Sequence, residues 1–346
     1  MSRAPDLDPR QAVDRWLDKL RVDKAEATVS GYWYRLKLFV EWCDDQEGIE
    51  SIRDLSGWDL DSYEHDRRAT GVSPVTLSNE LTTLRQFLAY CERVELVADG
   101  LSEKIDPPSI DESDEVNSER LEADSALAII RSYRDGFERA TTHHVLLELA
   151  WFIGARVGAI RGLDIRDIDT DACTVRFVHR PETGTTLKNG AGGERLVGIP
   201  DETATTLTRY LALNRTEMVD DHKRRPLLTT TQGRPSKNTL RSWSYYATTP
   251  CRAVECPHGK LRQSCDWFTR GEAVHCPSTL SPHRIRTGSI TWQLNRGLPV
   301  EVVAKRVNAS PEVIRKHYDV AGADEEFYER RAESVSRLSM EADDDN

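Results

Sequence analysis

The sequence contains no long apolar run and no apolar segment after its first methionine. Residues Ser2 to Arg10 are polar, and the longest apolar run, Val145 to Ala155, is interrupted by Glu148. A helix that spans a bilayer needs about 20 apolar residues, and a signal peptide needs an apolar core near its start. We therefore expect neither a membrane span nor an export signal, and we predict a cytoplasmic protein.

Lysine is scarce, and basic residues are outnumbered by acidic ones. Only 10 of the 47 basic residues are lysines, 37 are arginines, and the net charge of the 346-residue chain is −11. This balance disfavours nucleic acid as a partner, because phosphate binding needs basic surface. The acids gather, however, in Asp106 to Asp124 and Glu341 to Asp345, so other surfaces can still be basic. The composition indicates a salt-adapted host, although a GC-rich genome gives a similar bias toward arginine.

Cysteine is unevenly distributed along the chain. Three of the seven cysteines are scattered, and four fall in one stretch over 250–278, namely Cys251, Cys256, Cys265 and Cys276. In a chain without an export signal, such a cluster favours metal binding over disulfides. Four thiolates suit one structural zinc ion, with His258 or His275 as a substitute ligand. Reduced, partly buried cysteines are the alternative interpretation.

The length is sufficient for two domains, and the residue patterns divide the chain accordingly. Residues 9–105 read as a helical domain, in which Ser73-Pro74 announces a helix with a stripe of leucines. A charged, proline-marked linker follows over 106–120, and a second domain extends over 121–340. We therefore predict a mainly α-helical protein.

The second domain combines helices with a small antiparallel sheet. Helical patterns cover 121–136 and 141–155, and later 201–219 and 236–248. Between them, Cys173 to His179 has β character and Arg195 to Ile199 mirrors it across a glycine-rich turn. Three short helices follow the cysteine segment, and Ser281-Pro282 and Ser310-Pro311 have the form of helix starts.

The last third of the chain carries residues suited to attack on a phosphodiester. His283 and Arg286 share one face of a helix near its N-terminus, where free N–H groups favour phosphate. Tyr318 offers a hydroxyl nucleophile, and the guanidiniums of Arg286 and an isolated upstream Arg156 match the charge and planar geometry of phosphate oxygens. A histidine and an arginine at this spacing are more often an ordinary pair on a helix surface, although the full set of side chains would suit attack on a phosphodiester without a metal.

This pattern resembles the tyrosine recombinase, or phage integrase, family, in its Xer-like, archaeal and specifically haloarchaeal form. The matches occur in the family order at Arg156, Lys188, His283, Arg286 and Tyr318, and they extend the resemblance over nearly the whole chain. The resemblance implies an N-terminal SAM-like core-binding domain that clamps DNA, and an α+β catalytic domain. It also implies four protomers acting on paired sites in double-stranded DNA, and no catalytic cofactor.

The resemblance assigns a role to each matching residue. Tyr318 would form a 3′-phosphotyrosyl ester, and Arg156 and Arg286 would stabilise charge on the non-bridging oxygens. Lys188 would protonate the leaving 5′ oxygen, and His283 would assist proton transfer or contact the phosphate. The implied activity is site-specific recombination that integrates or excises a mobile element, with chromosome-dimer resolution as an alternative.

The chain also departs from the family pattern. Ala309 stands where a histidine or tryptophan is usual, and Asn308 replaces a glycine. Because alanine cannot bind phosphate through a hydrogen bond, a ligand is missing, and Asn308 and His317 are the nearest candidates to replace it. Ala309 therefore leaves open a catalytically impaired DNA-binding regulator with the same fold. A type IB-like topoisomerase is a third possible function.

Overall fold

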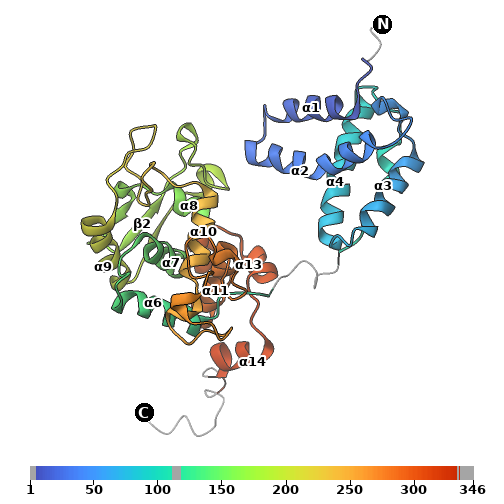
Figure 1. Cartoon of the computed structure of the whole chain (residues 1–346). Helices are drawn as coiled ribbons and strands as arrows, with labels where there is room; N and C mark the ends of the chain where they lie inside the picture. The colour runs from blue at the N-terminus through green and yellow to red at the C-terminus, as the bar shows by residue number, and fades with distance from the viewer. Residues whose placement is uncertain (1–4, 111–117, 333–334, 336–346) are drawn as a thin grey trace. The chain divides into compact units, whose positions relative to one another are not determined.

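A computed structural model describes residues 5–110, 118–332 and 335 of the chain. The chain divides into two compact units, Met1–Asn117 and Ser118–Asn346 (Figure 1). The acids Asp111, Glu112, Asp114 and Glu115 of the predicted linker, and those of 341–345, lie outside the described residues. Within the described part, no helix combines the length and the apolar character needed to cross a membrane.

Unit 1 is built from helices. Their bounds are α1 Pro9–Leu20, α2 Glu26–Asp44, α3 Gly57–Ala69 and α4 Pro74–Arg93, with short 3₁₀ turns at Ile52–Asp54 and Ser102–Lys104. Helix α4 begins as predicted, since the Ser73 hydroxyl accepts a hydrogen bond from the Thr76 N–H and Pro74 occupies the first turn. The leucine stripe of α4 is buried and packs with aromatic rings such as Phe39, Tyr63 and Phe87.

Unit 2 surrounds a small sheet with helices. The helices are α6 Ala123–Asp135, α7 Thr142–Ile153, α8 Val157–Gly162, α9 Asp201–Arg209, α10 Lys237–Ala247, α11 Pro282–Asn295, α12 Val300–Val307, α13 Pro311–His317 and α14 Ala323–Glu326. The strands are β1 Ile168–Asp169, β2 Thr174–Phe177 and β3 Arg195–Gly198. They pair antiparallel in the order β1-β2-β3, and Val175 lies opposite Val197.

Two details of unit 2 differ from the sequence prediction. The helix predicted to reach residue 219 ends after a π-helical turn, Tyr210–Asn214. There the guanidinium of the buried Arg215 donates to the carbonyls of Met218 and Pro226, which holds the following chain away from helical geometry. Strand β1 was not predicted, because two residues are too few to show an alternating pattern.

Helix α7 forms the centre of unit 2. It is buried along nearly its whole length and packs against α10 and α11. Its one carboxylate, Glu148, is fully buried and accepts hydrogen bonds from Arg134, Thr203 and Thr206, while His144 Nε2 lies 2.8 Å away. These partners satisfy a charge that would otherwise be costly to bury. These contacts hold α7 in place, and its C-terminal end at Ile153 leads directly into the candidate site.

Candidate active site

The first part of the site is the turn at the end of α7. Gly154 ends the helix in the left-handed conformation, with φ of 71°, and its N–H donates to the Ala150 carbonyl. A Cβ at this position would lie 2.9 Å from Ser289 Oγ and 3.0 Å from Val307 Cγ1. Only glycine fits both the φ angle and the space. The turn then presents Arg156, which immediately precedes α8.

Arg286 lies in the buried first half of α11 and is only 2% exposed. Its Nη1 donates to the carbonyl of Gly154 at 2.6 Å and to that of Val307 at 2.8 Å. Its Nε and Nη2 are also buried, yet they have no hydrogen-bond partner among the described residues. Burial lowers the pKa of Arg286 to about 10, with Tyr318 opposing this shift and Arg156 adding to it. Because a buried, unpaired N–H is costly, the free side of this guanidinium is suited to an anionic ligand.

Tyr318 follows α13 and is 6% exposed. Its ring centroid lies 4.9 Å from Arg286 Cζ and 5.5 Å from the ring centroid of His283. Its backbone is fixed on both sides, since its N–H donates to Ile314 and its carbonyl accepts from the Thr291 hydroxyl, each at 2.9 Å. The tyrosine is therefore held beside the guanidinium that has unused donors.

His283 occupies the first turn of α11, at the exposed side of the site. Desolvation by the surrounding protein lowers the pKa of its imidazole, and the charges of Arg286, Arg284, Arg156 and His317 lower it further. The imidazole is therefore biased toward its neutral form, which can accept a proton. Ser281 precedes α11 as predicted, but its side chain makes no capping hydrogen bond.

Three arginines bind consecutive carbonyls at the C-terminal end of α12. Arg195 Nε donates to the Arg306 carbonyl at 2.7 Å, Arg286 Nη1 to Val307 at 2.8 Å, and Arg156 Nη1 to Asn308 at 2.6 Å. The last carbonyls of a helix lack partners within it and carry partial negative charge, so they attract cations. One helix end thus gathers guanidiniums from three distant segments. Arg195 was not among the predicted site residues, because its sequence context indicates only a strand.

Asn308 ends α12 in the left-handed conformation, with φ of 55°. Asparagine tolerates this conformation better than most residues other than glycine, which accounts for its presence at this helix end. Its side-chain oxygen accepts a hydrogen bond of 2.8 Å from Asn189 Nδ2, next to Lys188. Asn308 therefore connects the β2–β3 hairpin with the arginine cluster. Lys188 itself is exposed, and no hydrogen bond or ion pair to it is found among the residues described.

The structure brings together four of the predicted site residues directly: Arg156, His283, Arg286 and Tyr318. The two accessory candidates differ. The carbonyl and side chain of Asn308 already accept hydrogen bonds from Arg156 and Asn189. His317 is half-buried, and its charge lowers the pKa of His283. Ala309 packs against the apolar cluster that contains Tyr318.

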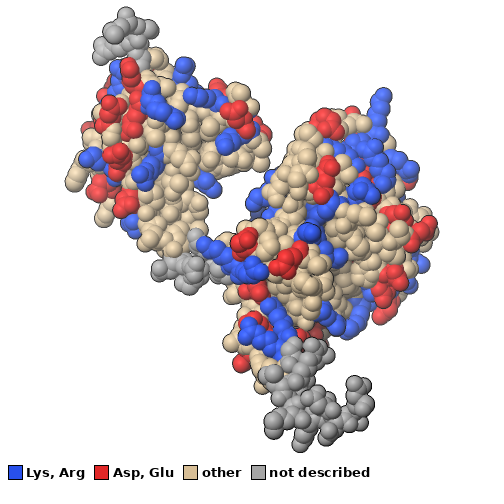
Figure 2. Space-filling view, turned by 180° about the vertical axis from the view of Figure 1, so that it is seen from behind, with Lys and Arg blue, Asp and Glu red and all other residues tan. Residues whose placement is uncertain are grey.

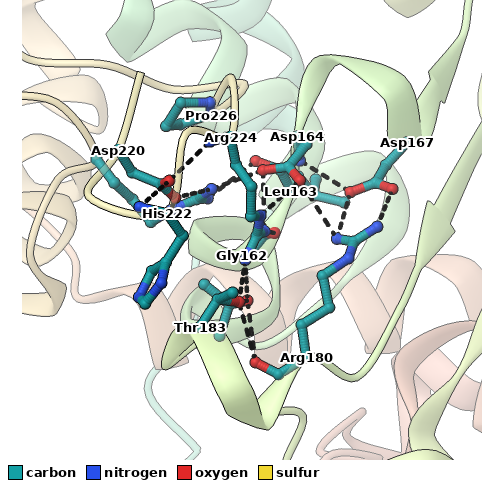
Figure 3. Close-up of polar contacts among 12 residues, drawn as sticks. Gly162, Leu163, Asp164, Asp167, Arg180, Thr183, Asp220, His222, Arg224 and Pro226 are labelled. Atoms are coloured by element: carbon teal, nitrogen blue, oxygen red, sulfur yellow. Dashed lines mark hydrogen bonds and ion pairs between the residues drawn. The ribbon is translucent and has the colours of Figure 1, made fainter. Parts of the chain in front are cut away.

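An ion-pair network fixes the base of the hairpin that carries Lys188 (Figure 3). Asp164 accepts hydrogen bonds from Arg224 at 2.8 Å and Arg234 at 2.6 Å, and Asp167 accepts from Arg180 at 2.6 Å. Burial alone would raise the pKa of Asp164, but the hydrogen bonds from the two arginines hold it below its usual value. Arg224 also donates to Thr185, so the network joins the segment after α8 to the hairpin.

The cysteine segment lies between α10 and α11. All four of its cysteines are free thiols, of which Cys276 is buried and the others half-buried. Burial raises the pKa of Cys251, and the nearby Cys256 and Cys265 raise it further. The Cys251 thiol therefore lies within electrostatic range of the other two. In the described ranges, however, no group of three or more His, Cys, Asp or Glu side chains is arranged to hold a metal ion.

The two units differ in charge. Residues 1–117 contain 14 basic and 26 acidic residues, whereas residues 118–346 contain 33 and 32. The acid excess of the chain is thus confined to unit 1 and the linker. Figure 2 shows Lys and Arg side chains gathered over part of one face of unit 2. Unit 2 therefore has the basic surface that a phosphate-rich partner requires.

Comparison with known proteins extends over both units. Residues 13–95 match the family described as "Phage integrase, N-terminal SAM-like domain". Tyrosine recombinase XerD of Mycobacterium leprae (strain TN) is 24% identical over 306 residues, which cover 83% of this chain and 85% of the relative.

Two solved structures are also similar. The Tn1549 transposon integrase, solved in complex with a circular intermediate DNA, has a TM-score of 0.63 and 15% identity, covering 95% of this chain and 99% of that one. The N-terminal domain of a phage integrase/site-specific recombinase from Haloarcula marismortui is 44% identical over 30% of this chain and 99% of that one, with a TM-score of 0.29. The predicted fold, mainly helical with a SAM-like N-terminal domain and a small antiparallel sheet, is confirmed.

Proposed function

The chain belongs to the tyrosine recombinase family, and we propose that it cleaves and rejoins double-stranded DNA at specific sites. The observation that carries the proposal is the position of Tyr318 beside Arg286, whose buried Nε and Nη2 have no partner among the described residues. An entering phosphate would satisfy these donors and place its phosphorus next to a hydroxyl nucleophile.

The cleavage step is a transesterification. The Tyr318 oxygen attacks the phosphorus, the bond from phosphorus to the 5′ oxygen breaks, and a 3′-phosphotyrosyl ester forms. The tyrosine proton passes to His283 or to water, and the leaving 5′ oxygen takes a proton from Lys188. Arg156 and Arg286 stabilise the charge on the non-bridging oxygens, where each fixed donor is typically worth about 10²–10³ in rate. Attack by another 5′ hydroxyl reverses the step and rejoins the strand.

Unit 1 and the assembly have their own proposed roles. Unit 1, over 9–105, clamps the DNA together with the catalytic unit at 121–340, and four protomers act on two paired sites. Exchange of strands between such sites would integrate or excise a mobile element in the cytoplasm.

We also propose one structural zinc ion in the cysteine segment. The supporting observation is that Cys251 lies within electrostatic range of both Cys256 and Cys265. A divalent cation would relieve the mutual repulsion of their thiolates, and Cys276 would be the fourth ligand. Zinc would stabilise the approach to α11 and would take no part in the reaction, which requires no cofactor.

A non-catalytic DNA-binding regulator is the second candidate, and Ala309 favours it because alanine supplies no ligand to phosphate. Covalent capture separates the two functions. The protein is mixed with a library of nicked duplexes of randomised sequence, denatured with detergent, and analysed for DNA that stays attached. Attachment through Tyr318 to a restricted set of sequences supports the recombinase, and binding without attachment supports the regulator. Attachment to all sequences, with relaxation of any supercoiled plasmid, would instead indicate a topoisomerase.

A further inference from the structure

Arg195, at the start of β3, belongs to the arginine cluster although the reaction as proposed makes no use of it. Its guanidinium is held on three sides. Its Cζ lies 4.0 Å from the centroid of the Phe177 ring. Its Nε donates to the Arg306 carbonyl at 2.7 Å, and its Nη1 donates to the Gly193 carbonyl at 3.0 Å. Such anchoring fixes the orientation of a side chain that is otherwise flexible.

The remaining nitrogen of Arg195, Nη2, is buried and has no hydrogen-bond partner in the part of the chain that the structure describes. Burial lowers the pKa of Arg195 to about 10, and the charges that lower it further are those of Arg286 and Arg156. Three guanidiniums thus repel one another within a partly dry site, and no carboxylate contributes to the pKa shift of Arg195. An anion that enters the cluster would offset this mutual repulsion.

We propose that Arg195 is a third phosphate-contacting arginine, whose Nη2 donates to a non-bridging oxygen of the scissile phosphate. The inference rests on the proposed function and extends it. It also accounts for Ala309, because the donor missing there would be replaced from the hairpin. Arg195 follows the same turn as Lys188, so a single hairpin delivers both the leaving-group acid and an additional charge-stabilising donor.

A merely structural role for Arg195 makes a different prediction. The hydrogen bond to the Arg306 carbonyl joins β3 to α12, and the bond to Gly193 braces the hairpin itself, so loss of the side chain could loosen the hairpin without any contact to phosphate. Substrates with and without a charge on the scissile phosphate group distinguish the structural role from the phosphate-contacting role. A methylphosphonate at the scissile position removes one charged oxygen and makes a residue that neutralises that oxygen dispensable.

The test uses a duplex that the wild type captures covalently, made with either a phosphate or a methylphosphonate of each configuration at the cleaved position. Arg195→Gln is compared with Arg176→Gln, which removes an exposed arginine on the neighbouring strand β2. We expect Arg195→Gln to form the covalent complex about 10²-fold more slowly than wild type on the phosphate. On one methylphosphonate isomer we expect the two rates to agree within about threefold.

Equal losses on both substrates, or a rate on phosphate equal to that of Arg176→Gln, would overturn the inference. If Arg195→Gln melts well below wild type, Arg195→Lys is judged by the same comparison, because it keeps the charge and shortens the reach. Failure of the wild type to attach to any DNA would remove the proposed function and this inference with it, whereas attachment with an unaffected Arg195 variant would remove the inference alone.

Discussion

Arg286 Nη1 donates a 2.6 Å hydrogen bond to the carbonyl of Gly154, which lies 132 residues earlier in the chain. The bond joins the first and last blocks of the site through backbone rather than through two side chains. The exact path of the α7 turn therefore decides where the guanidinium of Arg286 can lie.

Gly154→Ala should lower both stability and cleavage. A left-handed φ costs a residue with a Cβ about 1–2 kcal/mol, and the new methyl group would also press on Ser289 and Val307. We expect a loss of at least about 2 kcal/mol in the free energy of unfolding, measured by chemical denaturation. Gly198→Ala is the control, because nothing lies within 4 Å of its Cβ position and its φ is ordinary. Equal stability of the two variants would contradict the account of the turn.

Tyr318→Phe should abolish covalent attachment while DNA affinity stays within a few-fold of wild type, because only the nucleophilic oxygen is removed. Arg286→Ala and Arg156→Ala should instead keep a slow residual reaction, reduced by about 10²–10³. Single-turnover cleavage and gel-shift binding measure the two quantities separately. Attachment of the Phe variant to DNA would show that another residue is the nucleophile.

Asp164→Asn should loosen the hairpin that carries Lys188. The substitution leaves Arg224 and Arg234 buried without a full counter-charge, at a cost on the order of 3 kcal/mol. Cleavage should fall further than DNA binding, since the hairpin delivers the proposed acid. Asp171→Asn removes an exposed carboxylate nearby and should change stability by less than about 0.5 kcal/mol. Thermal unfolding and cleavage rates of both variants provide the comparison.

Acid should destabilise unit 2 through Glu148. Burial acts to raise the pKa of this carboxyl, but hydrogen bonds from His144, Arg134 and Thr203 lower it from 4.5 to about 2. Because the folded pKa is depressed, the stabilisation is fully present above pH 4.5 and is lost as the pH falls toward 2. Glu148→Gln should be less stable than wild type at neutral pH and should show a shallower loss over this window. Parallel pH profiles of unfolding would contradict the assignment.

Protein purified without chelator should contain about one zinc ion per chain if the cysteine segment is a closed structural site. Cys256→Ser should lose the metal, melt earlier and cleave poorly, because the segment leads into α11. Cys173→Ser, far from the segment in sequence, should retain the metal. Elemental analysis decides the matter, and full stability of metal-free protein would make these cysteines ordinary thiols.

Local signals in the sequence were sufficient for much of the fold. The Ser73-Pro74 and Ser310-Pro311 pairs marked two helix starts correctly, since capping depends on neighbouring residues alone. The end of the helix at Asn214 was missed, because it depends on where the Arg215 guanidinium finds carbonyls in the tertiary fold.

The candidate site also contains residues that the sequence could predict and one that it could not. Arg156, His283, Arg286 and Tyr318 could be selected because their order and spacing resemble those of the recombinase family, and the structure brings them together. Arg195 could not be selected, because its proximity to Arg286 and Arg156 arises from the packing of β3 against α12. Contacts that arise from the packing of distant segments produce no local sequence pattern from which they could be predicted.

The anchoring of three arginines on successive main-chain oxygens at 306–308 has a consequence for how this protein can change over generations. Carbonyls are supplied by every residue type, so most exchanges of one amino acid for another along α12 leave the anchors intact. The gain or loss of a single codon within the helix does not, because it would turn every later carbonyl by about 100° around the helix axis. We expect lineages of this protein to accumulate replacements on the exposed side of α12, at Glu301, Val302 and Lys305, while the length of the helix stays constant.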